Sequence, residues 1–392
     1  MKIVITESQL NKIMYSDLLV EERIKFNISI PEDIIKIKDI FKKNNYKLFV
    51  VGGAVRDAVL GKTPKDYDLT TDATPDEVET ILNNSGYKTL PTGKAFGVIN
   101  VFTDNDEYEI ATFRSESYSE SDKRRPDKVE FTDIETDAKR RDFTINALYY
   151  DIDTGEVVDL VGGVEDLKND IVRTVGNPDD RFNEDRLRIL RAIRFAGRFG
   201  SDLDNNVDQS LQRNSSIDGI SGERIRDEFI KGIISSKSTI HFLQLIDKYN
   251  LFDSIFRGLS VSKDFIEIKD PILVISRLLK NNDLSTIGKK LNNLKYSVDE
   301  IKDITFLINL KNMSLDNVIQ LKRIQKNTNL SDDQIMTFGN LEGIDKKLLN
   351  AFVNFNLTVS GDDVMKKMNL KPGKEVGDMI NKIELDNFKK II

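Results

Sequence analysis

The chain has 392 residues, of which 39% are hydrophobic and 31% charged, and its formal net charge is −7. It contains no cysteine and a single histidine, His241, which excludes disulfides, thiolate zinc sites and any site built from several imidazoles. No apolar run approaches the roughly 20 residues of a membrane span, so we expect a cytoplasmic protein with no membrane partner. Because cysteine and histidine ligands are almost absent, any metal is expected to be hard and oxygen-bound, such as Mg²⁺.

The first elements in chain order surround a pair of glycines. Residues 1–25 carry no motif and are expected to form an N-terminal extension. A helix (PEDIIKIKDIFKKN) and a strand (KLFVV) then lead to Gly52-Gly53, which open a short helix. Glycines in that position let a phosphate chain approach the N–H groups at the positive end of a helix, and Arg56 adds charge one turn later. An ordinary tight turn explains the same pattern.

The next predicted strand, DYDLTT, carries Asp66 and Asp68. Their spacing places both carboxylates on one face of a strand, where they repel each other unless a cation neutralises them. Mg²⁺ would do so while bridging the phosphates of a nucleotide. A D-x-D pair also occurs at solvated strand ends. A third catalytic carboxylate is expected on an adjacent strand; Glu109, in YEIATFR, is the best candidate, and an exposed strand glutamate is a close alternative.

The remaining pattern predicts an α+β protein with an N-terminal α/β head. A helix opens at Thr74-Pro75, strands follow near residues 97–102 and 107–114, and the polar stretch 115–128 is predicted to be a mobile loop. Beyond Gly163 the periodicity is helical. We therefore divide the chain into an extension (1–25), a head (26–162), a helical neck (163–235), and a helical body and tail (236–392) that binds RNA.

The neck contains an arginine-rich segment, EDRLRILRAIRF, with six arginines between positions 181 and 198. The segment is predicted to be one nucleobase-recognition helix on which Asp185 and Arg188 share a face, and Arg191 and Arg194 continue the row. A carboxylate accepts from an exocyclic amine and a guanidinium donates to ring acceptors, so the pair can imitate the pairing edge of a base. Such a site accepts CTP and ATP and rejects UTP and GTP. A salt-bridged surface helix is the alternative.

Several motifs follow one another along the chain in an order that is typical of one protein family. GGAVRDAVLGKTPKDYDLTTDATPDEV (Gly52–Val78), EIATFR, RRDFTINAL (Arg140–Leu148), GNPDDRFNEDRLRILRAIRFA (Gly176–Ala196) and GERIRDEF (Gly222–Phe229) together resemble the class II tRNA nucleotidyltransferase and bacterial poly(A) polymerase family. The likeness spans most of the chain beyond residue 30. It implies a palm-like nucleotidyltransferase head followed by an all-helical neck, body and tail.

The resemblance also implies roles for single residues. Asp66 and Asp68 would bind Mg²⁺, and Arg141 would contact the nucleotide. The triphosphate would meet Gly53 and Arg56. The other implied positions are Asp142 and Asn146 at the ribose, Asp185 and Arg188 at the base, and Glu184 as a brace for the arginines.

The implied reaction is template-independent addition of CMP and AMP, from CTP and ATP, to the 3′ end of tRNA, with release of pyrophosphate. The strand TGKAFGVINV is similar to the tRNA-end-adding branch, whereas the poly(A) branch carries a bulky basic segment there. A poly(A) polymerase or an A-adding enzyme stays open within the family. A non-catalytic RNA-binding protein is the alternative from another class. The sequence leaves the oligomeric state undefined.

Overall fold

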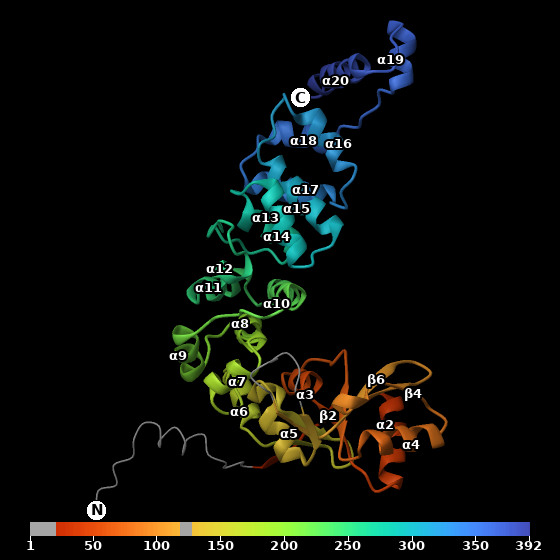
Figure 1. The fold of residues 1–392 in the computed structure, drawn as a ribbon, viewed down its shortest axis with the longest axis vertical. Helices are drawn as coiled ribbons and strands as arrows, with labels where there is room; N and C mark the ends of the chain where they lie inside the picture. The colour runs from red at the N-terminus through yellow and green to blue at the C-terminus, as the bar shows by residue number, and fades with distance from the viewer. Residues whose placement is uncertain (1–20, 118–127) are drawn as a thin grey trace, which may run out of the picture. The chain divides into compact units, whose positions relative to one another are not determined.

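The computed structural model describes residues 21–117 and 128–392. The chain forms two compact units, Met1–Ile220 and Ser221–Ile392. Strands and helices make up the first unit, and the described elements of the second are all helices (Figure 1). The expected α+β class is confirmed. The fourfold division made from the sequence stays a prediction, and the boundary between the two units falls inside the segment 163–235.

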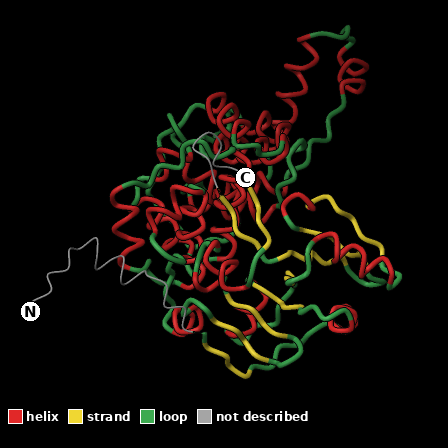
Figure 2. The backbone as a smooth tube through the Cα atoms, turned by 60° about the horizontal axis from the view of Figure 1, so that its bottom comes forward, coloured by secondary structure: helices red, strands yellow, loops and turns green. Residues whose placement is uncertain are grey.

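An eight-stranded sheet forms the centre of the first unit (Figure 2). All neighbouring strands are antiparallel except β3 and β6, which run parallel. The spatial order is β1 (Glu22–Lys25), β10 (Glu156–Asp159), β9 (Leu148–Asp151), β2 (Leu48–Val51), β3 (Asp68–Thr71), β6 (Glu107–Thr112), β5 (Val98–Phe102) and β4 (Lys88–Gly93). The continuous apolar run of β2 suits a strand with both faces covered, and every residue of β2 is buried.

Two segments differ from the expectations. Residues 22–25, expected in an extension, form β1 and pair with β10 at the sheet edge. Their sequence, ERIK, has one apolar residue and so gives no strand signal. The ends of the predicted loop 115–128 belong to the antiparallel strands β7 (Arg114–Ser117) and β8 (Lys128–Phe131). The rest of that predicted loop, 118–127, lies outside the described residues.

Helices pack against the sheet and continue beyond it. In chain order they are α2 (Glu32–Lys43), α3 (Gly53–Val59), α4 (Pro75–Asn84), α5 (Ile134–Arg140), α6 (Gly163–Lys168), α7 (Pro178–Glu184), α8 (Leu187–Phe199) and α9 (Asn205–Arg213), with short 3₁₀ turns η1 (Lys94–Phe96) and η2 (Thr144–Asn146). The predicted start of α4 is confirmed by a capping box between Thr74 and Glu77. Ala138 of α5 packs on a cluster that includes Phe49, Val51 and Tyr149.

The described helices of the second unit enclose a separate core. They are α10 (Gly222–Ser235), α11 (Thr239–Lys248), α12 (Leu251–Ile255), α13 (Pro271–Leu279), α14 (Leu284–Asn293), α15 (Val298–Leu310), α16 (Val318–Gln325), α17 (Asp332–Leu341), α18 (Lys346–Asn354), α19 (Gly361–Met368) and α20 (Lys374–Lys389). Phe338, Phe352 and Phe388 are buried together in it. Within residues 21–117 and 128–392, no helix has the length and apolar character needed to cross a bilayer.

Candidate active site

Two aspartates lie at the beginning of β3. The strand starts at Asp68, and Asp66 precedes it by two residues, so the expectation that both lie on the strand is wrong for Asp66. Asp68 is open to solvent, yet its carboxylate is crowded enough that desolvation raises its pKa; Arg141 lowers that pKa and the charge of Asp66 raises it further. The two carboxylates therefore repel each other near one guanidinium, which is where a bound cation would be favourable.

Glu109 lies on β6, the strand beside β3. Because Leu69 is level with Ile110 in the parallel ladder, Glu109 is level with Asp68. Among the residues that the structure describes, no three carboxylate or imidazole side chains are grouped so that they could hold a metal ion. Glu109 is thus close in register to the aspartates without forming a three-carboxylate group with them.

The glycine pair connects β2 to α3. Gly52 has φ of 71°, in the left-handed region that side chains rarely adopt, and a Cβ there would lie 3.8 Å from Nη1 of Arg141. Its N–H donates to the carbonyl of Leu148 over 3.0 Å, so this group is committed to the sheet. The N–H groups that the motif presents at a helix N-terminus are therefore those of the first turn of α3, from Gly53 onward.

Arg56 lies one turn into α3 with its side chain buried. Its Nη1 donates to Asn146 over 2.6 Å, its Nε donates to Asp57 over 3.0 Å, and its guanidinium lies 5.2 Å from the ring centre of Phe195. Burial lowers the pKa of Arg56, Asp57 raises it, and the charges of Arg198 and Arg194 lower it again. Several arginines therefore share one small region, and clustered guanidinium groups can bind a polyanion.

A chain of hydrogen bonds joins this region to η2 and α8. The Asn146 amide that accepts from Arg56 donates to Asp142 over 3.2 Å. Asp142 in turn accepts from Nε of Arg191 over 2.7 Å. Burial alone would raise the pKa of Asp142, but Arg191 and Asn146 hold it below its usual value. The carboxylate is therefore an anion that orients Arg191.

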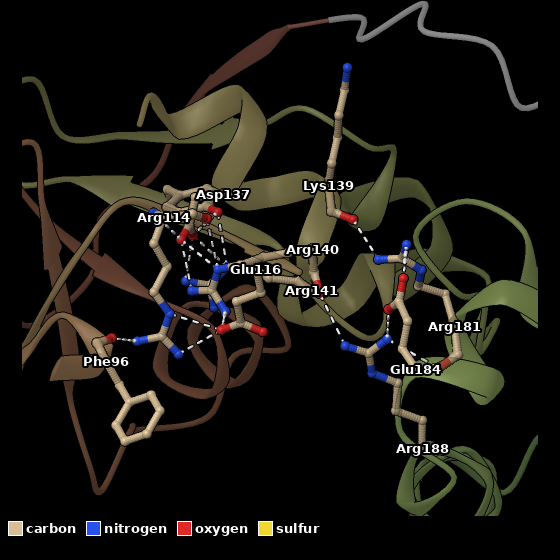
Figure 3. Close-up of polar contacts among 11 residues, drawn as sticks. Phe96, Arg114, Glu116, Asp137, Lys139, Arg140, Arg141, Arg181, Glu184 and Arg188 are labelled. Carbon is tan, nitrogen blue, oxygen red and sulfur yellow. Dashed lines mark hydrogen bonds and ion pairs between the residues drawn. The ribbon is translucent and has the colours of Figure 1, made fainter. Parts of the chain in front are cut away.

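Arg141 is fixed by Asp137, which is fully buried in α5 (Figure 3). Nη2 of Arg141 donates to Asp137 over 3.0 Å, and its Nε donates to the hydroxyl of Tyr149 over 2.9 Å. Burial opposes the charge of Arg141, but Tyr149 and Asp137 raise its pKa above its usual value, so it stays a cation. Arg140 also donates to Asp137, over 2.7 Å, and links it to Glu116 of β7.

The arginine-rich segment is not one helix. α7 ends at Glu184, Asp185 is extended with φ of −143° and ψ of 107°, and α8 begins at Leu187. The Asp185 carboxylate accepts from the N–H of Leu187 over 3.0 Å, so an aspartate at this point starts a new helix instead of continuing the old one. The expectation that Asp185 and Arg188 share a helix face is therefore wrong. Arg188 contacts Glu184 instead, over 2.5 Å.

Arg194 and Arg191 both lie against Phe195 of α8. Their guanidinium carbons are 4.2 Å and 5.7 Å from the ring centre. Together with Arg56 they surround one buried aromatic side chain, which attracts cations through its π face. The two arginines are thus grouped with α3 and Asp142, whereas Arg188 faces α5.

The sequence of this chain matches known families and proteins. Residues 48–173 match the family described as "Poly A polymerase head domain", and residues 202–262 match "Probable RNA and SrmB- binding site of polymerase A". A CCA-adding enzyme of Ligilactobacillus salivarius is 32% identical over 91% of this chain and 92% of its own length. The chain belongs to the class II tRNA nucleotidyltransferase and bacterial poly(A) polymerase family. It is an RNA nucleotidyltransferase.

Other members of the family match to different extents. A CCA-adding enzyme of Lactobacillus helveticus is 32% identical over 86% of this chain and 88% of its own length. Poly(A) polymerase I of Salmonella typhi is 34% identical, but the match covers 65% of this chain and 56% of that protein. The fold resembles that of the Bacillus stearothermophilus CCA-adding enzyme, with a TM-score of 0.67, 23% identity, and 90% and 91% of the two chains covered.

Sequence reasoning missed several residues that hold the candidate site together. Asp137 accepts from two arginines, and Tyr149 accepts from Arg141. The ring of Phe195 packs against three guanidinium groups. Asp57 accepts from both Arg56 and Arg198. The spacing of Asp137 four positions before Arg141 was a usable signal, because such residues are neighbours on a helix. The aromatic partners give no comparable signal, since their contacts are distant in sequence.

Proposed function

We propose that this chain adds CMP and AMP, from CTP and ATP, to the 3′ end of tRNA without a template and releases pyrophosphate. One observation favours CCA addition over poly(A) synthesis within the family. The CCA-adding relative from Ligilactobacillus salivarius matches 91% of the chain, including its helical second unit, whereas the match to poly(A) polymerase I covers 65%. The longer match to the CCA-adding relative supports CCA addition over poly(A) synthesis.

The aspartate pair fits a divalent ion, and Mg²⁺ is the ion that the donors favour. Both donors are carboxylates, and desolvation together with mutual repulsion raises the pKa of Asp68, a cost that a bound cation removes. Mg²⁺ commonly takes one or two protein carboxylates and completes its shell with phosphate oxygens and water. When bound, the ion polarises the attacking hydroxyl and neutralises charge on the phosphates. Glu109 is proposed as a catalytic carboxylate beside the pair.

The protein's own residues would orient the triphosphate. Gly53 brings the N–H groups of α3 close to the phosphates, because a helix N-terminus attracts anions. Arg56 and Arg194 supply positive charge from the group around Phe195. Arg141 lies close to Gly52, lowers the pKa of Asp68 through its charge, and keeps that charge through Asp137. These groups would hold the α-phosphate in line with the 3′ hydroxyl of the RNA, and most of the rate enhancement would come from this positioning.

Asp185 and Arg188 are proposed to select the base even though they do not share a helix. Cytosine and adenine each present an amine donor beside a ring acceptor, which suits a carboxylate next to a guanidinium. Uracil and guanine present a carbonyl where the amine would be, and a carboxylate repels it. Asp142, Asn146 and Arg191 are proposed to contact the ribose side of the nucleotide, because they form one hydrogen-bonded chain with Arg56 beside the triphosphate groups.

The test uses purified protein, Mg²⁺ and a tRNA that lacks its last three nucleotides, with each nucleoside triphosphate supplied separately and in pairs. CTP alone should be incorporated, and AMP should follow only after CMP. Asp66→Ala should abolish incorporation and leave tRNA binding largely intact. Incorporation of ATP alone as long tracts would favour a poly(A) polymerase, and a single AMP added only to tRNA ending in CC would indicate an A-adding enzyme. tRNA binding without incorporation would favour a non-catalytic RNA-binding protein.

A further inference from the structure

Arg188 is held by three acceptors on two elements of the first unit (Figure 3). Its Nη1 donates to the carbonyl of Arg181 over 3.1 Å and to Oε2 of Glu184 over 2.5 Å. Its Nη2 donates to the carbonyl of Arg140 over 3.2 Å. The side chain is almost fully buried, with 9% of its surface exposed, so these contacts fix the plane of the guanidinium.

This pattern leaves a defined edge of Arg188 for a ligand. A guanidinium has five N–H donors; here Nη1 has two acceptors and Nη2 has one. Among residues 21–117 and 128–392 no acceptor lies at Nε, and Nε and Nη2 belong to the same edge of the planar fork. Two parallel donors on one edge are suited to a ring nitrogen beside a carbonyl oxygen, the pattern that cytosine presents.

Arg181 holds the same carboxylate from the other side. Its Nη2 lies 2.5 Å from Oε1 of Glu184, while Oε2 of Glu184 takes Arg188. Its Nη1 donates to the carbonyl of Lys139 over 3.1 Å. Arg181 and Arg188 therefore rest on consecutive carbonyls, those of Lys139 and Arg140, at the end of α5, where the helix dipole favours cations.

We propose that Arg181 is a positioning residue for base selection, a role that rests on the function proposed above. Arg181 does not need to touch the nucleotide. It fixes the Glu184 carboxylate against α5, and that carboxylate in turn sets the plane in which Arg188 offers its Nε and Nη2 donors. Without Arg181, Glu184 keeps only one of its two arginine partners and can rotate with Arg188. The expected effect is weaker discrimination between bases, with the rate of nucleotidyl transfer little changed.

The experiment measures kcat and KM for CTP and for UTP on tRNA lacking its last three nucleotides, together with the thermal midpoint of each variant. Arg181→Ala should lower the CTP-to-UTP ratio of kcat/KM by about 10-fold, the effect of losing about one oriented hydrogen bond. The loss should appear mainly as a higher KM for CTP, with kcat changed by about 2-fold at most. Arg181→Lys should recover part of the ratio, because an ammonium keeps the charge without the planar fork.

The matched control is Arg213→Ala. Arg213 also forms an ion pair with α7, at Asp179 over 2.6 Å, but it lies on α9 and has no contact with Glu184. Its removal should leave the CTP-to-UTP ratio unchanged. An unchanged ratio in Arg181→Ala, or an equal fall in Arg213→Ala, would overturn the proposal. If Arg181→Ala fails to fold, the ratio measured for Arg181→Lys decides in the same way.

Failure of the broader function gives a different result. A wild-type protein that adds AMP but no CMP would refute CCA addition, and the role of Arg181 would then be decided by the ATP-to-GTP ratio in the same variants. A wild-type protein that incorporates neither nucleotide would overturn both proposals.

Discussion

Arg56 donates a 2.6 Å hydrogen bond to Asn146, although the two residues are 90 positions apart in the chain. This bond joins the helix after the glycine pair to the turn before β9. Through Asp142 it continues to Arg191 of α8. The residues proposed to meet the triphosphate and those proposed to meet the ribose are therefore parts of one hydrogen-bonded chain.

Replacing Asn146 should weaken nucleotide binding without changing base choice. Asn146→Ala removes the acceptor that orients Arg56, and a hydrogen bond to a charged group contributes about 1.5–3 kcal/mol. We expect KM for CTP and for ATP to rise together by about 10-fold or more. The CTP-to-UTP ratio of kcat/KM should be unchanged, because Arg188 is held by α5 and α7 and not by Asn146. Steady-state kinetics check this. Asn83→Ala, which removes an exposed acceptor of Thr89, is the control and should have no effect.

Asp68 should reduce the stability of the metal-free protein. Its pKa is raised in the folded state, so the ionised carboxylate costs stability above that pKa, and the cost disappears once the pH falls below the ordinary aspartate value of about 3.9. Asp68→Asn should therefore raise the thermal midpoint at pH 7 in chelator while abolishing incorporation. Adding Mg²⁺ should stabilise the wild type more than the variant. An equal Mg²⁺ effect on both would argue against a metal at this position.

Asp137 should affect the stability of the first unit with the opposite sign to Asp68. Burial would raise its pKa, but Arg141, Arg140 and Tyr149 hold it below the usual value. Its contribution is therefore complete above about pH 3.9 and is lost as the pH falls through the depressed value. Asp137→Ala should cost about 3–5 kcal/mol at pH 7, the scale of breaking a buried ion pair.

Denaturant unfolding at several pH values checks the Asp137 prediction, and the difference from wild type should shrink in acid. Asp39→Ala, which removes an exposed partner of Lys38, should cost about 0–1 kcal/mol. A loss for Asp137→Ala that is no larger than the loss for Asp39→Ala would contradict the assignment of Asp137 as an anchor.

Two glycines of the second unit should respond in opposite directions to alanine. A Cβ on Gly232 of α10 would lie 2.1 Å from the ring of Phe242, so Gly232→Ala should destabilise by about 1–3 kcal/mol through overpacking. A Cβ on Gly377 of α20 would meet no atom within 4 Å. Gly377→Ala should therefore stabilise by about 0.5–1 kcal/mol, as alanine does in a helix interior. Thermal unfolding of the two variants checks both signs.

The parts of the site that could be predicted from sequence are those with local chemistry. The cap at Thr74, the turn at Gly52 and the acidic residue at the start of β3 each follow from a few neighbouring residues. The break at Asp185 was missed because periodic leucines and arginines continue through it, whereas the Asp185 carboxylate caps the N–H of Leu187 and starts a new helix there.

The contacts that orient the arginines across long sequence separations could not be predicted in this way. Arg188 reaches the carbonyl of Arg140, 48 positions away, and Arg198 reaches Asp57 across 141 positions. Such pairs depend on the packing of helices against a sheet and leave no periodic trace in the sequence. The residue types at the site and the nearby partner Glu184 of Arg188 were therefore predictable, but the partners distant in sequence were not.

The most direct test of the account is the sequence of the product formed when tRNA lacking its last three nucleotides is incubated with the protein, Mg²⁺ and all four nucleoside triphosphates. We predict that each tRNA gains C, C and A in that order and is extended no further, and that Asp66→Ala forms no product. Long adenylate tracts, or incorporation of UMP or GMP at a rate comparable to CMP, would contradict the account.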